Sequence, residues 1–455
     1  MALAAGLALG ALLTPLAVPL LTGWPNGVTR SIAAQLPHAG TDPVAAFYAE
    51  RHNRPLWVTR QGPRRETAAL IAILRDAGAD DLDPRTYAPD RLAAEVAAAK
   101  AHPDPSSLAR ADVDLSRAFA AFVGDLRRPP SEAALKFVDP AVRLPPTDPT
   151  AILNAAARAP DLAIALSEAQ RMSPIYDDLR SALGTARASG DRRAPLLAAN
   201  LERARALPPD LGARYILVNP AAETLWFNRS GAAPLTMPVV VGKTDDQTPT
   251  MIGLLRYALL NPYWNVPPDL VREKIAPAVL REGAGYMARR RFEALADFSP
   301  GAAILDPAGV DWAAVAAGAR TLRVRQLPGG DNLMGQLKFM LPNPLGIYLH
   351  DTPLRTEFAA DLRTDSHGCV RLQDAARLAL WILGHSVAAA PSGGPDQRVD
   401  IGPPIAVYIL YLTAQPQPGG GVTFLGDIYH RDPPLLAALG ERAAQSRFPA
   451  GGGLH

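Results

Sequence analysis

The sequence GIYLHDTP at residues 346–353, followed by SHGCVR at 366–371, contains the only cysteine of the chain, Cys369, close to two histidines. The first stretch starts with an apolar run, Ile347–His350, that is typical of a strand ending in a histidine. Directly after the second stretch, apolar residues from Leu372 to Leu383 recur at helical spacing. This segment therefore predicts a strand, a loop that carries the cysteine, and a helix.

The sequence pattern of the chain changes at Pro208-Pro209. After this point, short β-branched and aromatic runs predict strands at Arg214–Val218, Thr224–Asn228, Pro238–Val241, Arg256–Leu260, Leu322–Gln326, Leu337–Met340, Ile347–His350 and Ile405–Leu412. Two stretches between them predict helices, Leu270–Glu282 and Tyr286–Ala296, within an insertion at about residues 261–320.

Residues 35–205 predict helices instead. Asp42 is placed to cap a helix whose first residue is Pro43, and further helical patterns occur at Thr67–Ala77, Leu92–Lys100, Val113–Leu126, Ile152–Leu166, Ile175–Leu183 and Leu196–Ala206. The order of elements predicts an α+β fold. We expect a helical scaffold domain at 35–205, a β-rich domain at 206–440 and a C-terminal tail at 441–455.

Composition excludes some classes of function. The 455 residues are 48% hydrophobic, and 46 Lys and Arg residues nearly balance 44 Asp and Glu residues. Such a chain is long enough to bury a large core and to form more than one domain. Nucleic-acid binding is not expected, because it needs clustered positive charge and no basic run appears. No spacing of His, Glu or Cys typical of a metal site occurs, so no metal and no cofactor are expected.

The N-terminus predicts export. No charged residue occurs before Arg30, and about 20 apolar residues are enough to span a bilayer. The small residues Ser31, Ala33 and Ala34 also fit the end of a signal peptide. Residues 1–34 are therefore interpreted as a signal peptide or a membrane anchor, which places the protein in the periplasm or cell envelope. A buried core helix is the alternative.

A lone cysteine is a candidate nucleophile if a base lies nearby and its thiolate is favoured. Because a helix is expected soon after Cys369, we predict that the N–H groups at a helix N-terminus favour the thiolate. Gly368 removes bulk beside the sulfur, and the amides of Gly368 and Cys369 are candidates for an oxyanion hole. Spacing alone allows either His350 or His367 to be the base. The alternative for Cys369 is an inert buried thiol.

The two stretches resemble the signature of L,D-transpeptidases of the YkuD type. Further motifs resemble the large YcbB-like branch of that family: Val241-Gly-Lys243 with Thr248-Pro249, Asn261–Pro268, Val310-Asp-Trp312, Gln336–Phe339 and Asp427-Ile-Tyr429. The resemblance covers roughly residues 205–440 and implies a β-sandwich-like catalytic domain with a helical cap insertion. Members of that branch often carry a small helical peptidoglycan-binding module before the catalytic domain. No such repeat is found between Met172 and Ala206.

The resemblance implies roles for individual residues. Cys369 would attack the bond between diaminopimelate and D-Ala in a peptidoglycan tetrapeptide stem, and His350 would be the base, oriented by the backbone carbonyl of Asp351. Gly368, Asp351, Ser366 and His367 would support the nucleophile or the oxyanion, and Arg371, Tyr348 and Trp264 would contact the substrate. The acyl-enzyme would pass to an amine of a second stem and give a 3→3 cross-link.

Two other functions stay open. The same site could use water as the acceptor, which would make the protein an L,D-carboxypeptidase or another hydrolase. A non-catalytic cell-wall binding protein could also keep the fold, although an intact nucleophile and base argue against it. The sequence leaves the acceptor and the oligomeric state undetermined.

Overall fold

The computed structural model describes residues 26–36, 42–390 and 394–447. Contacts divide the chain into two compact units, one with residues up to Ala77, Pro84–Gly124 and Thr147–Ala169, the other with Gly78–Asp83, Asp125–Pro146 and the chain from Gln170 on. The helices that follow residue 173 thus belong by their contacts to the second unit. A domain boundary at residue 205 stays a prediction.

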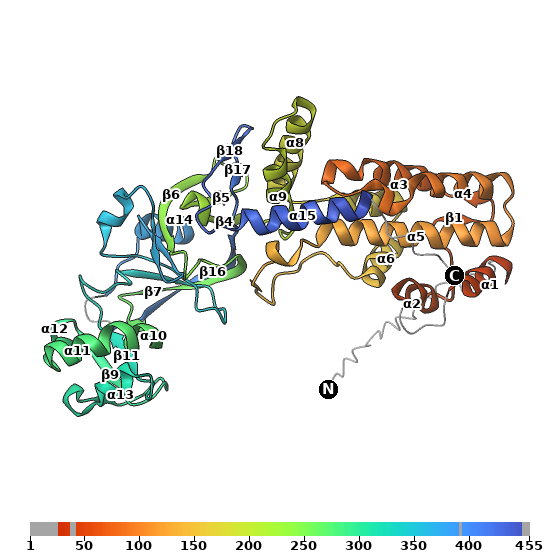
Figure 1. The fold of residues 1–455 in the computed structure, drawn as a ribbon. Coiled ribbons are helices and arrows are strands. Elements are labelled where there is room, and N and C mark those ends of the chain that lie inside the picture. The colour runs from red at the N-terminus through yellow and green to blue at the C-terminus, as the bar shows by residue number, and fades with distance from the viewer. Residues whose placement is uncertain (1–25, 37–41, 391–393, 448–455) are drawn as a thin grey trace, which may run out of the picture. The chain divides into compact units, whose positions relative to one another are not determined.

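The first unit is helical (Figure 1). Its helices are α1 (Asn26–Gln35), α2 (Pro43–Glu50), α3 (Glu66–Arg75), α4 (Pro89–Ala101), α5 (Pro105–Arg127), α6 (Pro149–Arg158) and α7 (Leu162–Gln170), with a small pair of strands, β1 (Val58–Thr59) and β2 (Gly62–Pro63). Asp42 caps α2 as predicted, since its carboxylate accepts a hydrogen bond from the Val44 amide. The single helix expected over Ile152–Leu166 is two, because Ala159 before Pro160 is extended.

The second unit is built on a sheet whose strand pairings form a ring. Its described strands are β3 (Phe137–Val138), β4 (Arg214–Asn219), β5 (Thr224–Arg229), β6 (Leu235–Gly242), β7 (Met251–Leu260), β12 (Leu337–Met340), β13 (Leu349–His350), β14 (Thr364–Ser366), β15 (Val370–Leu372) and β16 (Gln397–Ile409). They follow the order β12-β13-β15-β6-β5-β4-β16-β7, and β12 also pairs with β7. The ring of pairings therefore closes around one core.

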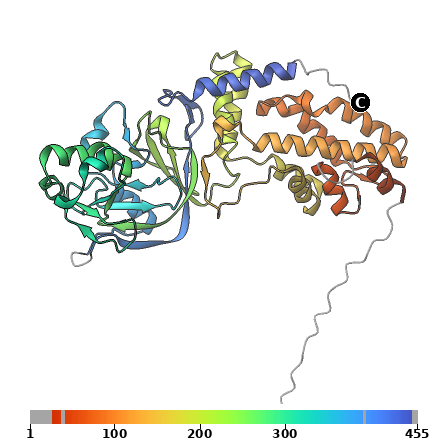
Figure 2. The same ribbon diagram turned by 60° about the horizontal axis from the view of Figure 1, so that its bottom comes forward.

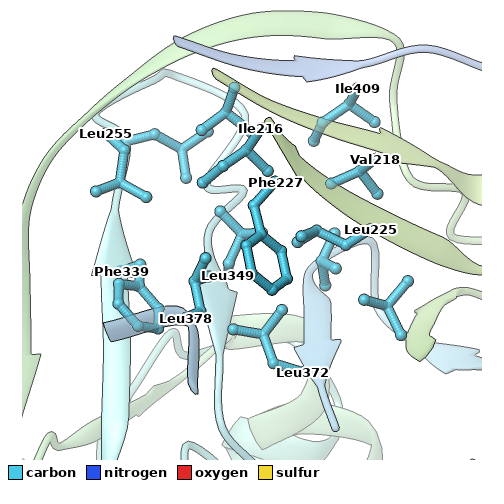
Figure 3. Close-up of a cluster of buried hydrophobic side chains, with 14 of the residues drawn as sticks. Ile216, Val218, Leu225, Phe227, Leu255, Phe339, Leu349, Leu372, Leu378 and Ile409 are labelled. Carbon is cyan, nitrogen blue, oxygen red and sulfur yellow. The ribbon is translucent and has the colours of Figure 1, made fainter. Parts of the chain in front are cut away.

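Apolar side chains of these strands fill that core (Figure 3). Phe227 on β5 is buried among residues of other strands and of helix α14 (Ala375–Leu383), and Figure 3 shows its ring between Leu349, Leu372 and Leu378. The helix buries the face that its apolar spacing predicts. Because β13 and β15 each contribute side chains to this cluster, packing in the core holds both strands in place. His350 is the last residue of β13, and Cys369 directly precedes β15.

The insertion between β7 and β12 has a core of its own. It contains the antiparallel strands β8 (Trp264–Val266), β9 (Phe292–Leu295), β10 (Ile304–Leu305) and β11 (Arg323–Gln326), and the helices α10 (Pro268–Leu270), α11 (Ala276–Glu282), α12 (Gly285–Arg289) and α13 (Trp312–Ala316). Figure 2 shows it in green beside the strands of the ring. The expectation of a helix over Tyr286–Ala296 was wrong for its second half, which forms β9. The apolar residues there are buried on both sides of a short strand, a pattern that periodicity cannot distinguish from a helix.

The remaining elements of this unit are helical or short strands. They are the helices α8 (Pro174–Ser189), α9 (Ala194–Ala204) and α15 (Asp432–Arg447), and the strand pair β17 (Ala414–Pro416) and β18 (Val422–Phe424). Helix α15 runs into the segment expected to be a tail from residue 441, and residues 448–455 lie outside the described residues. At the other end, α1 covers part of the predicted export segment, and residues 1–25 are outside the description. None of the helices in the described ranges has the length and apolarity that crossing a bilayer requires.

The core makes a stability prediction. Phe227→Ala should lower the free energy of unfolding by about 3–5 kcal/mol, because it removes a buried ring and leaves a cavity. Leu235→Ala, at the partly exposed cross-strand partner of Phe227, should cost under about 1 kcal/mol. Urea unfolding followed by circular dichroism measures both. Equal losses for the two variants would contradict the assignment of Phe227 to the core.

Candidate active site

His350 and Cys369 come together because β13 and β15 pair in parallel. In this pairing Leu349 lies beside Val370 and His350 beside Arg371. Side chains on a strand alternate between faces, so Leu349 and Val370 point into the core. His350 and Arg371, and the residues two positions before them, Tyr348 and Cys369, point the other way.

These side chains open onto one cleft of about 330 Å³. Its lining includes Cys369, His350, Ser366, His367, Arg371, Tyr348 and Trp264, together with Asp246, Pro267, Asp269, Leu270, Leu333, Met334, Leu345 and Gly346. Among the predicted site residues, only Gly368 and Asp351 are outside this lining. The structure thus places the predicted nucleophile and both candidate bases around the same space.

The His350 ring is held by the backbone. Its Nδ1 lies 2.5 Å from the carbonyl oxygen of Asp351, and because a carbonyl only accepts, Nδ1 carries the hydrogen. This leaves Nε2 unprotonated and able to accept a proton. Burial lowers the pKa of His350 to about 3, with Arg371 and Lys338 contributing in the same direction. The imidazole is therefore neutral at neutral pH.

Asp351 holds that carbonyl in place. Its buried carboxylate accepts a hydrogen bond from the Gln336 amide at 2.8 Å and pairs with Arg355. Gly335, with a φ of +59°, packs directly against the same carboxylate, so a Cβ at that position would collide with it. Asp351 thus acts on the ring through the backbone rather than by facing the cleft.

The sulfur of Cys369 is surrounded by protein yet keeps some exposed surface at the cleft. The thiol lies 3.5 Å from the Gly346 carbonyl, and burial raises its pKa, although the Tyr348 backbone N–H and the positive charges of Lys338 and Arg371 act the other way. The expected helix N-terminus beside the sulfur was wrong. Strand β15 separates Cys369 from α14, and Asp374 caps that helix.

The loop before Cys369 is held by its own hydrogen bonds. Ser366 is buried and its hydroxyl donates to the Cys369 carbonyl at 2.5 Å. Gly368 has a φ of +94°, a region that favours glycine, and a Cβ there would lie 3.2 Å from Ile347 Cδ1. Within the described part of the chain, the amides of Gly368 and Cys369 have no hydrogen-bond acceptor.

Two polar residues of the signature, His367 and Arg371, already have partners in the protein. His367 Nδ1 lies 2.8 Å from an oxygen of Asp246, which also pairs with Lys243 at 3.0 Å. Arg371 donates from Nη1 to both carboxylate oxygens of Glu357 at 2.6 Å, and from Nη2 to the Asp365 carbonyl at 3.2 Å. The Arg371 guanidinium therefore holds the segment from Glu357 to Asp365 in place.

The aromatic residues take two different positions. Tyr348 packs edge-on against His350, with 5.6 Å between ring centroids, and burial together with the neighbouring Cys369 raises its pKa. Trp264 opens the insertion on β8, faces the cleft and packs against the core of that insertion. The adjacent Tyr263 instead stacks under the Arg325 guanidinium at 4.1 Å.

Sequence reasoning missed two charged residues at this site. Asp246 holds His367, and only the spatial approach of its loop reveals the pair. Lys338 is buried on β12 opposite His350. A signal for Lys338 was present, since a lysine inside the apolar strand LKFM is unusual for a buried position.

Two domain families match parts of the chain. Residues 42–183 match a scaffold domain, and residues 213–405 match the L,D-transpeptidase catalytic domain of the YkuD family. The chain therefore has a helical scaffold domain followed by a β-rich YkuD catalytic domain. This confirms the predicted fold class.

A Haemophilus influenzae protein, whose name assigns it provisionally to the L,D-transpeptidases, is 31% identical over 246 residues. The match covers 52% of this chain and 48% of that protein, so the chain spans about half of the length of this relative. An L,D-transpeptidase structure from Mycobacterium smegmatis matches at 12% identity over 43% of this chain and 58% of its own, with a TM-score of 0.21.

The site predicts a stability effect at Gly335. Gly335→Ala should lower the free energy of unfolding by about 2–3 kcal/mol, since alanine is strained at positive φ and its Cβ meets the Asp351 carboxylate. Gly330→Ala in the same loop has open space and should change it by under about 0.5 kcal/mol. Denaturant titration measures both variants. A Gly335→Ala protein as stable as the control would refute the packing described for Asp351.

The lowered pKa of His350 predicts a pH effect. The unfolded chain protonates this ring below about pH 6.5 and the folded protein only near pH 3, so folding stability from this group is lost as pH falls through that window. The loss should approach about 1 kcal/mol per pH unit. His350→Gln should lack this component, whereas His385→Gln, at an exposed histidine, should keep it. The unfolding free energy of the wild type and both variants is measured at a series of pH values. Parallel pH curves for the wild type and His350→Gln would contradict the lowered pKa of His350.

Proposed function

We propose that this chain, whose residues 213–405 match the YkuD catalytic domain, is a cysteine-dependent peptidoglycan L,D-transpeptidase. The supporting observation is that Cys369 and His350 lie on paired strands and line the same cleft, with the ring oriented by the Asp351 carbonyl. The amides of Gly368 and Cys369, for which no acceptor occurs among the described residues, would supply two donors for a developing oxyanion. A nucleophile, a base and an oxyanion site are the parts that acyl transfer needs.

The first half of the proposed reaction forms an acyl-enzyme. The Cys369 thiol gives its proton to Nε2 of His350 as the sulfur bonds to the carbonyl carbon between diaminopimelate and the terminal D-Ala of a tetrapeptide stem. The carbonyl oxygen becomes negative and the two amides bind it. When the intermediate collapses, the C–N bond breaks, His350 returns the proton to the nitrogen, and D-Ala leaves. A thioester to Cys369 remains.

The second half transfers the acyl group. An amine of a second stem attacks the thioester carbonyl and loses a proton to Nε2 of His350. The C–S bond then breaks, and the sulfur leaves and regains the proton. The product is a 3→3 cross-link. Because both side chains are neutral at rest, the proton moves only when a carbonyl is in place, which restricts the reaction to the filled cleft.

The other residues would support this chemistry. Ser366 and Arg371 hold the nucleophile loop through the Cys369 carbonyl and Glu357, respectively. His367 is tied to Asp246 at the edge of the cleft, which fits a supporting role rather than that of the base. Tyr348 and Trp264 would form walls that contact the stem peptide.

The proposed location is the cell envelope, where peptidoglycan stems occur. The apolar segment at residues 1–34 would serve as a signal peptide or anchor, and the scaffold domain together with the insertion at 264–326 supports membership in the large YcbB-like branch. Water as the acceptor is the second candidate, since the cleft is open and partly polar. It would give tripeptide stems and no dimers.

The proposal predicts the loss of one reaction product. Cys369→Ala should release no D-Ala from purified tetrapeptide muropeptides, and His350→Gln should lower the rate at least about 100-fold, because the general base is gone. His385→Gln should keep the wild-type rate. Mass spectrometry of the products separates cross-linked dimers, expected for transfer, from tripeptides alone, expected for hydrolysis. Normal turnover by folded Cys369→Ala would disprove the proposed nucleophile.

A further inference from the structure

Lys338 lies on the same face of the sheet as the candidate catalytic pair. In the pairing of β12 with β13, Lys338 is directly opposite His350, and in the pairing of β13 with β15, His350 is opposite Arg371. These three side chains form a row across three strands, because directly paired residues point to the same face. Tyr348 and Cys369 form the next row.

The Lys338 ammonium points from its own row to the next. Its Nζ lies 3.8 Å from the centroid of the Tyr348 ring, a cation–π contact, while the residue as a whole is only 8% exposed. Within the described ranges this ammonium has neither an ion pair nor a hydrogen bond to a protein group. Because the Lys338 side chain is largely buried, a nearby negative charge would stabilise its ammonium.

We propose that the Lys338 ammonium is the electrostatic partner of Cys369, stabilising the negative charge that the sulfur carries during attack and during release of the thioester. This inference rests on the proposed function, since a charged sulfur matters only if Cys369 is the nucleophile. It replaces the helix N-terminus, which the structure places elsewhere, as the source of positive potential at the sulfur. Lys338 acts through Cys369 and is therefore a positioning residue.

The other charged groups around the sulfur cannot provide this potential equally well. Arg371 is neutralised by Glu357, and His367 is paired with Asp246. His350 is neutral at rest, and Tyr348 acts on the sulfur through hydrogen bonds from its backbone N–H and its side chain rather than through a charge. The remaining charged neighbour of Lys338 is Asp396, an exposed residue on the segment after α14.

The pKa directions agree with this arrangement. Burial lowers the pKa of Lys338, while the charges of Cys369 and Asp396 raise it. The reciprocal effect lowers the pKa of Cys369 against the larger effect of burial. Lys338 also disfavours a proton on His350.

The test is the pH dependence of alkylation at Cys369. Because the chain has one cysteine, modification by iodoacetamide reports this thiol alone. Lys338→Met should raise the pKa of Cys369 by about one unit and slow alkylation at pH 7 about tenfold, since a unit charge at close range is removed. Lys338→Arg should stay near the wild-type pKa. Lys136→Met, at an exposed lysine directly before β3, makes the same change in net charge and should have no effect.

The outcomes separate this inference from the proposed function. An unchanged thiol pKa in Lys338→Met would overturn the role of Lys338, whether or not the protein turns over muropeptides. If the wild type produced no D-Ala while the thiol pKa shifted as expected, the proposed function would fail and the electrostatic pairing would stand. Thermal melting checks folding, and Lys338→Gln gives the same comparison if the methionine variant does not fold. A purely structural role would lower the melting temperature without moving the thiol pKa.

Discussion

The parallel pairing of β13 with β15 is the constraint on which the site depends. It sets Leu349 against Val370 in the core, and the alternation of the strands then places His350 and Cys369 together on the opposite face. Each strand is only two or three residues long, so these pairings alone would be weak. The closed ring of strands and the core around Phe227 keep them in register.

Burial has a second consequence at this face. The pKa of the thiol is raised and that of the imidazole is lowered, so both groups rest in neutral form at neutral pH. A neutral pair costs less to bury than an ion pair, which needs excellent hydrogen bonding to offset desolvation. The Asp351 carbonyl fixes the tautomer of the ring without adding charge. The Asp351 carbonyl thus orients the ring of His350, and burial keeps that ring neutral.

Much of the fold could be predicted from local patterns. Capping at Asp42, apolar runs such as Arg214–Val218 and the apolar face of α14 reflect periodicity and turn chemistry, which short windows contain. Strand β9 could not be distinguished from a helix, because both of its faces are buried. Residue type and spacing singled out Cys369 and left His350 and His367 as candidate bases, and only the family resemblance favoured His350. Asp246 and Lys338 reach the site only through strand pairing and loop packing. The expected helix start beside Cys369 was wrong because the three residues after it form strand β15, which is too short for its pattern to be recognised.

The insertion leaves and rejoins the rest of the domain at neighbouring points. Its first strand begins at Trp264 and its last ends at Gln326, and these two residues are partners across β8 and β11. Their backbones are therefore about 5 Å apart, the spacing of adjacent strands. A segment whose ends meet in this way can be lengthened, shortened or exchanged with little disturbance to the ring of strands. The part of the insertion that lines the cleft can therefore change while the strands that position Cys369 and His350 keep their register.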